Sequence, residues 1–217
     1  MIKNIINSTN SCPLCNSPSS VFYKHEKQLY HQCNNCRGIF IDKSLIPSRK
    51  TEMLRYQKHQ NDVEDDGYRN FVSPITTAIM KDFSPHHKGL DFGAGTGPII
   101  SKILNEKNFQ IKLYDPFFHN YPHLLKVNYD YIVACEVIEH FHDPKKEFSL
   151  LKKILTQNGK LYCMTNIYDN STDFQKWDYK SDITHVFFYH QKTIRWITKE
   201  FGFSNDTIKD RLIIFSN

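Results

Sequence analysis

The eight residues LDFGAGTG, from Leu90 to Gly97, carry the strongest structural signal in this chain of 217 residues. Hydrophobic residues on either side of an acid precede three glycines at alternate positions, which is typical of a buried strand that ends in a tight turn. Glycine lets the backbone of such a turn approach a ligand closely, and a cofactor that carries a nucleoside fits there. An ordinary strand-to-helix turn is the weaker alternative, because three spaced glycines would only weaken a strand or helix interior.

The spacing of these glycines argues against a dinucleotide site. The dinucleotide fingerprint is G-x-G-x-x-G, and Pro98 stands where its third glycine would be. Proline is well tolerated at the first position of a helix, so a strand, a turn and a helix are still predicted. Asp91 offers a carboxylate that can meet an ammonium group. An amino acid tail therefore fits this turn better than a pyrophosphate.

Length and composition indicate a globular chain of enzyme size, with room for one α/β domain and a small appendage. The mean hydropathy is −0.54, and the sequence has neither an apolar run of 18 residues nor a signal-like start. We therefore expect a cytoplasmic protein without a membrane partner. The formal net charge of +5 comes from residues 1–50, which hold seven Lys or Arg against two Asp or Glu. Such an excess can favour an anionic partner, but solvated surface explains it more often.

Two C-x-x-C pairs predict a zinc ribbon over residues 1–45, with zinc as a structural metal. Cys12 and Cys15 are followed after seventeen residues by Cys33 and Cys36, which places four thiolates on two facing knuckles. Disulfides are the alternative, but no secretory signal is present and a reducing cytosol disfavours them. The segment has so few hydrophobic residues that we expect it to need the metal in order to fold.

Residues 46–87 are predicted to form a polar, helical connector and lid, punctuated by prolines and a glycine. Its aromatic residues are candidates to cover a bound cofactor, although aromatics at such spacing more often pack in a core. These candidates are Tyr56, His59, Tyr68 and Phe71.

Residues 88–217 alternate between strand and helix patterns, which predicts an α/β, doubly wound, Rossmann-like and mostly parallel sheet. Strands are expected at 87–92, 110–115, 129–135 and 160–165, helices at 98–105, 144–155 and 193–201, and an edge strand at 212–215. Only 13 residues separate the second strand from the third, so one βα unit is abbreviated. Cys135 and Cys163 are expected to be core residues of strands.

Asp115 is expected at the carboxyl end of a strand, where ligands bind to such sheets. A carboxylate there can accept hydrogen bonds from both hydroxyls of a ribose, as an adenosine ligand requires. An acid that merely caps a strand end is the alternative. Local aromatic residues, Phe117 or Phe118, are expected to form the adenine pocket.

The segment CEVIEHF, from Cys135 to Phe141, supplies candidate metal ligands. In a helical turn Glu136, Glu139 and His140 would share one face, and such a face can hold a divalent metal. His185, farther along the chain, is a candidate fourth ligand near the same strand ends. Against a metal, acids in a first helical turn are favoured by the helix dipole alone, and His140 can simply cap or pack.

From Leu90 to about Phe203 the chain resembles class I S-adenosylmethionine-dependent methyltransferases, in the broad group of the ubiquinone-biosynthesis O-methyltransferases. LDFGAGTG, the acid of LYDPFF, YDYIVACEVIEHF and NGKLYCMTN carry this resemblance. With CPLC and CNNC ahead and THVFFYH behind, the whole chain is similar to bacterial methyltransferases with an N-terminal zinc ribbon. The resemblance implies S-adenosylmethionine as cofactor, bound by Asp91, Gly93, Ala94, Gly95, Gly97, Asp115, Pro116 and Cys135.

The segment EVIEH, with a later histidine, is also similar to the metal-binding set of small-RNA 2′-O-methyltransferases. There the metal holds the hydroxyls of the RNA terminus. The resemblance implies a second divalent metal in this chain, with four ligands: Glu136, Glu139, His140 and His185.

The expected reaction is transfer of a methyl group to the oxygen of a small hydroxylated metabolite. A metal at EVIEH would lower the pKa of the acceptor hydroxyl; otherwise His140 or His185 is the expected catalytic base. RNA as acceptor, docked by the ribbon, is an alternative, but the ribbon lacks a dense basic patch with exposed aromatics. A third hypothesis is a non-catalytic module that has lost the cofactor, and the intact glycines and Asp115 disfavour it.

Overall fold

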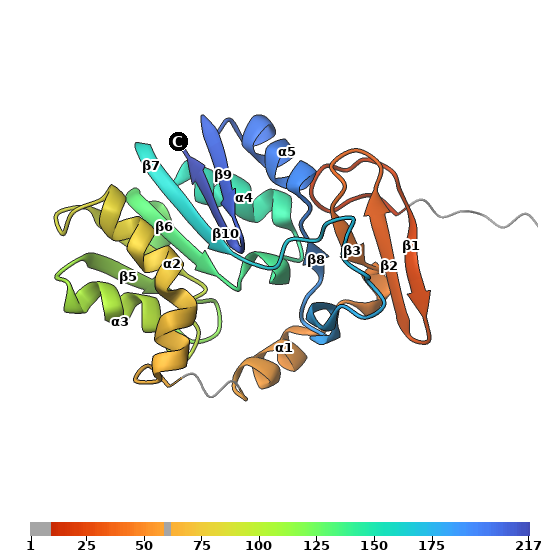
Figure 1. Ribbon diagram of the computed structural model, residues 1–217, viewed down its shortest axis with the longest axis horizontal. Helices are drawn as coiled ribbons and strands as arrows, with labels where there is room; N and C mark the ends of the chain where they lie inside the picture. Colours follow the sequence, from red (N-terminus) through yellow and green to blue (C-terminus); the bar gives the residue numbers. More distant parts are fainter. Residues whose placement is uncertain (1–9, 59–61) are drawn as a thin grey trace, which may run out of the picture.

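The computed structural model describes residues 10–58 and 62–217, and within them the chain forms two β-sheets (Figure 1). The larger sheet has six strands in the order β5-β4-β6-β7-β10-β9, and β5, β4, β6 and β7 run parallel. These strands are β4 (Lys88–Phe92), β5 (Gln110–Tyr114), β6 (Tyr129–Cys135), β7 (Leu155–Met164), β9 (Asn205–Lys209) and β10 (Leu212–Ser216). The predicted Rossmann-like, mostly parallel sheet is confirmed.

Helices cover both faces of the larger sheet. Tyr131 and Val133 of β6 pack with residues of α2 (Asp66–Asp82) and α3 (Ile99–Glu106). Ile132 and Ala134 point the other way, into a cluster that includes residues of α4 (Pro144–Lys153) and α5 (Gln191–Phe201). Successive side chains of a strand alternate between faces, and because both faces are buried the strand reads as an almost continuous hydrophobic run.

The end of the larger sheet differs from the prediction. The strand predicted at 212–215 is present as β10, but its expected position at the edge is wrong: β10 lies between β7 and β9 and pairs antiparallel with both. The edge strand is β9, which the sequence analysis missed. Its sequence, Asn-Asp-Thr-Ile-Lys, is mostly polar, because an edge strand at the surface buries little and needs no hydrophobic run.

The abbreviated unit between β5 and β6 is confirmed. Within the described residues that connection holds only a short 3₁₀ helix, η2 (Pro122–Lys126), in place of a covering α-helix. No helix of the described chain is long and apolar enough to cross a membrane.

The predicted connector contains two helices with different roles. Ser48 caps α1 (Arg49–Tyr56), and Asp65 caps α2 by accepting a hydrogen bond from the N–H of Tyr68. α2 buries Val72, Ile75 and Ile79 against the larger sheet, so this helix belongs to the core of the Rossmann-like unit. Only α1 has the position of a connector.

The smaller sheet joins the N-terminal segment to the rest of the chain. Its order is β1-β2-β3-β8, with β1 (Ser19–His25), β2 (Gln28–Cys33) and β3 (Ile39–Ile41) from the ribbon. The fourth strand, β8 (Phe187–Phe188), comes from the C-terminal part and lies beside β3 (Figure 1). The ribbon is therefore an integral part of the fold.

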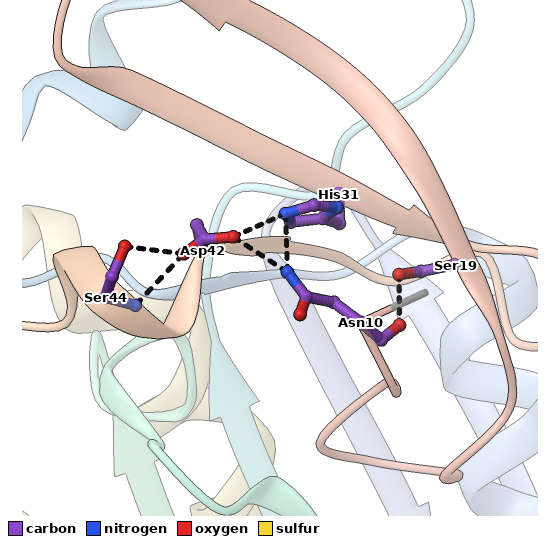
Figure 2. Close-up of polar contacts among 5 residues, drawn as sticks. All are labelled: Asn10, Ser19, His31, Asp42 and Ser44. Carbon is purple, nitrogen blue, oxygen red and sulfur yellow. Dashed lines mark hydrogen bonds and ion pairs between the residues drawn. The ribbon is translucent and has the colours of Figure 1, made fainter. Parts of the chain in front are cut away.

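A network of polar side chains joins Asn10, near the start of the ribbon, to Asp42 near its end (Figure 2). The Asp42 carboxylate accepts hydrogen bonds from the Asn10 amide (2.7 Å) and the Ser44 N–H (3.0 Å), and it contacts Nε2 of His31 (2.9 Å). The hydrogen bond from the Ser44 hydroxyl is the main reason why the pKa of Asp42 is lowered to about 2. Asp42 also caps the short helix η1 (Lys43–Leu45), so the network fixes the segment that leaves β3.

We predict that Gly89→Ala lowers the free energy of unfolding by about 1–3 kcal/mol, the usual cost of overpacking a core. A Cβ at this position of β4 would lie 2.6 Å from the Tyr131 hydroxyl, which is held in place by its hydrogen bond to the Gln110 carbonyl (2.9 Å). Urea denaturation measures the effect. The neighbouring exposed change, Lys88→Ala, should stay within about 0.5 kcal/mol of wild type. Equal stability of all three proteins would contradict the prediction.

Candidate functional site

A cavity of about 800 Å³ lies at the carboxyl edge of the parallel strands. Its walls include the loops that follow β4, β5 and β6, together with residues of α1 and of the start of α4. The volume is at the upper end of the range for ligand sites, 300–1,000 Å³, so it has room for a cofactor with a second small molecule. This edge is where the sequence analysis expected a ligand.

The glycine loop after β4 forms one wall. Gly93 and Gly95 have φ angles of 82° and 62°, in the left-handed region that favours glycine. A Cβ on Gly93 would also lie 2.5 Å from the side chain of Val137. The N–H groups of Gly93 and Ala94 donate to the carbonyl of Tyr114, which ties the loop to β5. The loop is thus held in one shape before any ligand binds.

Asp115 follows β5 and connects this loop to the next wall. One carboxylate oxygen accepts hydrogen bonds from the N–H groups of Phe117 (2.7 Å) and Phe118 (3.0 Å), and the other accepts from Gly95 (3.1 Å). The guanidinium of Arg49 lies 4.7 Å from the ring centre of Phe117. An acid, a glycine loop and two aromatic rings therefore meet at the end of β5.

The predicted cofactor residues divide into two groups. Six of them line the cavity: Gly93, Ala94, Gly95, Asp115, Pro116 and Cys135. Asp91 and Gly97 are not among the lining residues. The buried Asp91 carboxylate accepts a hydrogen bond from the hydroxyl of Ser101 in α3 (2.8 Å), and burial raises its pKa to about 6. Asp91 therefore supports the loop from the side of α3.

Glu139, His140 and His185 form a candidate metal cluster, since one potential ligand atom of each lies within 4.8 Å of the others. Glu139 is fully buried, and its Oε2 atom has no hydrogen-bond partner in the described chain. Nδ1 of His140 donates to the carbonyl of Thr184 (2.8 Å), and Nδ1 of His185 donates to that of Tyr179 (2.6 Å). A carbonyl can only accept, so Nδ1 carries a proton in both rings, and in a neutral ring the lone pair then lies on Nε2. Metal-binding histidines are typically oriented in this way.

Burial also sets the ionisation of this cluster. It raises the pKa of Glu139 to about 7 and lowers the pKa of His185 to about 4. At neutral pH the His185 ring is therefore uncharged, as a metal ligand must be.

Glu136 lies outside the cluster, which corrects the expected shared helical face. Only Ile138–His140 are helical here, as the 3₁₀ helix η3, and Glu136 precedes it with a left-handed φ of 52°. Its carboxylate pairs with Arg211 (2.6 Å) and accepts from the hydroxyl of Tyr179 (3.2 Å). A non-glycine residue in this region is strained, and such strain is often found at functional sites.

Several residues in or next to the cavity were not predicted, because their partners are distant in sequence. Glu52 of α1 is buried and forms an ion pair with His142 (2.8 Å), and both line the cavity. Arg211 and Tyr179 reach Glu136 from elsewhere in the chain and belong to no recognisable motif. Of the aromatic candidates, Tyr56 and Tyr68 line the cavity and Phe71 does not, while His59 lies outside the described residues.

The four ribbon cysteines fit a zinc ion. Their sulfur atoms lie within 4.8 Å of one another, with 3.7 Å between Cys12 and Cys36 and 3.3 Å between Cys15 and Cys33. Tetrahedral zinc with Zn–S bonds of 2.3 Å needs sulfur atoms about 3.8 Å apart. The N–H groups of Asn35 and Cys36 point at the sulfur of Cys33, which favours the thiolate.

Comparison with protein families identifies both parts of the chain. Residues 36–208, more than half of the chain, match the family model described as a methyltransferase domain. The chain belongs to this methyltransferase family. Residues 11–45 match a model described as a transcription factor zinc-finger, of the zinc-ribbon type, in agreement with the four cysteines. A search of curated proteins found no match.

Solved structures with a similar fold are methyltransferases of low sequence identity. The 1,6-didemethyltoxoflavin-N1-methyltransferase of Burkholderia thailandensis, solved with its substrate and S-adenosylhomocysteine, is 11% identical, with 91% of this chain and 99% of that chain covered and a TM-score of 0.55. An S-adenosylmethionine-dependent methyltransferase of Archaeoglobus fulgidus is 15% identical (coverage 70% and 100%, TM-score 0.52).

A candidate O-methyltransferase of Nostoc punctiforme is 14% identical to this chain (TM-score 0.51); 68% of this chain and only 56% of that chain are covered. The chain thus spans little more than half the length of that relative. These identities establish the shared fold alone. Because the structures include an N-methyltransferase, the fold does not choose the acceptor atom.

We predict that Asp115→Asn weakens binding of S-adenosylmethionine about 10- to 100-fold, because hydrogen bonds to a charged group are worth about 1.5–3 kcal/mol. Isothermal titration calorimetry measures the Kd. Asp130→Asn is the matched control, since Asp130 lies at the opposite, amino end of β6 and bonds to the N–H of Lys88. Equal affinity of the Asp115 variant and wild type would exclude a ribose contact by this carboxylate.

The raised pKa of Asp91 predicts that the free energy of unfolding depends on pH. Its folded pKa of about 6 exceeds the ordinary 3.8, so the folded protein binds a proton that the unfolded chain lacks between these pH values. Stability therefore falls as the pH rises through this window. Asp91→Asn removes this pH dependence. The free energy of unfolding of the variant minus that of wild type should therefore rise between pH 4 and pH 7, by at most about 3 kcal/mol. Urea denaturation at both pH values tests this, and a constant difference would contradict it.

Proposed function

We propose that this chain transfers the methyl group of S-adenosylmethionine to a hydroxyl oxygen of a small molecule, with the help of a divalent metal. The observation that carries this proposal is the placement of two sites around one cavity. The glycine loop and Asp115 line it, and so do His140 and His185 of the candidate metal cluster. A cofactor and a metal-bound acceptor would therefore meet in the same space.

The cofactor half of the site consists of the glycine loop, Asp115 and their neighbours. The bound product in the Burkholderia structure supports S-adenosylmethionine as the cofactor of this fold. In our proposal the Asp115 carboxylate accepts hydrogen bonds from the two ribose hydroxyls. Phe117 and Phe118 flank the adenine, and N–H groups of the loop face the amino acid tail. Pro116 and Cys135 complete the wall.

The acceptor half consists of Glu139, His140 and His185. When bound, S-adenosylmethionine supplies a methyl group on a sulfonium, and a divalent metal lowers the pKa of an acceptor hydroxyl. The residues then have to hold the acceptor oxygen in line with the methyl carbon, since such alignment is worth about 7–11 kcal/mol. The oxygen forms the new bond to carbon, the electron pair of the broken bond stays on sulfur, and the hydroxyl proton passes to a base or to water.

The electrostatics of His185 favour the metal over catalysis by this histidine alone. A ring with a pKa near 4 accepts a proton only weakly at neutral pH, so it is a poor catalytic base. The same neutral ring, with its lone pair on Nε2, suits a metal. In the absence of a metal, His140 is the remaining candidate base.

RNA is the second candidate acceptor, because three of the four residues implied by the resemblance to small-RNA methyltransferases lie together. Binding of RNA would weaken as salt rises, by about 0.9 log units per log unit of salt for each phosphate contacted on a duplex. A flat salt dependence, measured by fluorescence anisotropy with a labelled RNA, would exclude it.

We predict that methyl transfer to catechol, a small vicinal diol used as probe, requires Mg²⁺ or Mn²⁺. Transfer from labelled S-adenosylmethionine should fall about 100-fold or more in His185→Ala, a typical loss when activation of the attacking oxygen is removed. His25→Ala, an exposed change on β1, is the control and should be active. Equal turnover after chelation that spares the ribbon zinc would exclude the metal.

A further inference from the structure

We infer that the zinc ribbon positions the acceptor half of the site: through β3 and β8 it holds Glu139 and His185 in place, while the cofactor half is independent of it. This inference rests on the proposed function for the role of these two residues. It assigns the ribbon a task inside the site, in place of docking a distant partner. Each link of the connection is a specific contact.

The first link joins the zinc knuckle to β8. β3 begins three residues after Cys36 and pairs antiparallel with β8, Ile39 opposite Phe188 and Phe40 opposite Phe187 (Figure 1). A second contact comes from the start of α5, where the hydroxyl of Thr193 donates to the carbonyl of Cys36 (2.9 Å). The backbone around a zinc ligand is thus bound directly to the C-terminal part of the chain.

The second link joins this junction to the metal cluster through Val186, the residue after His185. Its carbonyl accepts a hydrogen bond from the N–H of Ile41 at the end of β3 (3.0 Å). Its own N–H donates to the carbonyl of Glu139 (2.9 Å). One residue therefore connects the ribbon to both Glu139 and His185, and any shift of β3 is passed to both.

The junction is packed too tightly to absorb such a shift. A Cβ on Gly38 would clash with the tip of the Phe187 ring, whose Cε1 atom would lie 2.9 Å from it. Phe40 stacks on the same ring with an interplanar angle of 10°. The zinc ligands Cys12, Cys33 and Cys36 belong to the same buried hydrophobic cluster as Phe187, Tyr189 and Ile194. Because cores this dense do not deform smoothly, displacement of the ribbon displaces β8.

The cofactor half is held by other contacts. The glycine loop is bound to Tyr114 of β5 and to Asp115, and Asp91 beneath it is bound to Ser101 of α3. These hydrogen bonds lie within the Rossmann-like unit. From the side of the ribbon, α1 adds an exposed hydrogen bond from Arg49 to the carbonyl of Pro116 (2.8 Å) and the contact of Arg49 with Phe117. A ribbon without zinc should therefore change the acceptor half and leave the affinity for S-adenosylmethionine unchanged.

Two variants test the junction in the full-length, zinc-loaded protein. Thr193→Val removes the hydroxyl that bonds to Cys36 in a side chain of the same shape, and Gly38→Ala forces the Phe187 ring away. Thr193→Ser restores the hydroxyl and is the rescue variant. Thr193 also caps α5 together with His190, so His190→Ala is the matched control that weakens the cap without touching Cys36.

Three readouts are compared in these proteins and in zinc-depleted wild type. Amide hydrogen exchange over residues 184–190 should be at least tenfold faster in the Thr193→Val, Gly38→Ala and zinc-depleted proteins. Mn²⁺ binding at the cluster should weaken about tenfold in the two variants, and Kd for S-adenosylmethionine should stay within twofold. Thr193→Ser and His190→Ala should behave like wild type in all three measurements.

Unchanged exchange over residues 184–190 in the variants would overturn the inference. So would a parallel loss of affinity for S-adenosylmethionine, because the ribbon would then support the whole domain and not the acceptor half. The exchange measurement needs neither an acceptor nor a second metal. If wild type transfers no methyl group, the proposed function fails, while the exchange and cofactor-binding results still decide whether the ribbon positions this segment.

Discussion

The pairing of β3 with β8 is the interaction on which the rest of the structure depends. Neither part of it is stable alone: β3 has three residues and β8 has two, and strands this short need a packed face to persist. The ribbon supplies that face only when its four cysteines are held together, since its own hydrophobic core is small. The Rossmann-like unit in turn supplies Phe187 and Tyr189. The ribbon and the segment after His185 therefore pack as one unit, although Cys36 lies about 150 residues from that segment in the sequence.

Charge balance explains why two neighbouring acids, the buried Glu139 and the half-buried Glu136, are tolerated beside the cavity. Burial raises the pKa of both Glu136 and Glu139 to about 7, so each carboxylate is costly when ionised. Arg211 offsets the charge of Glu136 by direct pairing. Glu139 has the hydroxyl of Tyr179 as a hydrogen-bond donor but no cationic partner of its own among the described residues. Beside it stand His140 and a His185 ring that is uncharged at neutral pH, and carboxylate and imidazole groups are the kinds of ligand that the proposed divalent cation would take. Because Glu136 pairs with Arg211, it would not be a ligand of this cation. The cation would then have more coordination positions left for an acceptor.

The sequence predicted those features that depend on local pattern. The glycine loop, the acid after β5, the four parallel strands and the four cysteines each leave a signature within a few residues, and each lies where it was expected. What local pattern could not predict depends on distant partners. β9 has no hydrophobic run because it is an edge strand, and β8 is only two residues long. The hydrogen-bond partners of Glu136 are Tyr179 and Arg211, which lie more than 40 residues away in the sequence. The expected helical face failed because the chain turns through a left-handed residue before η3, and no spacing rule encodes that turn.

The helix α1 follows the ribbon in the chain and contributes Arg49, Glu52 and Tyr56 to the cavity wall. Three contacts tie it to loops of the Rossmann-like unit: Glu52 to His142, Arg55 to Asp182, and Arg49 to the carbonyl of Pro116. Arg55 and His142 are each 40% exposed, but their partners Asp182 and Glu52 are only 15% and 8% exposed, so these pairs are partly buried. α1 thus joins the ribbon to the loops after β5 and β6, and its Tyr56 packs against Phe117 and His140 in the cavity wall.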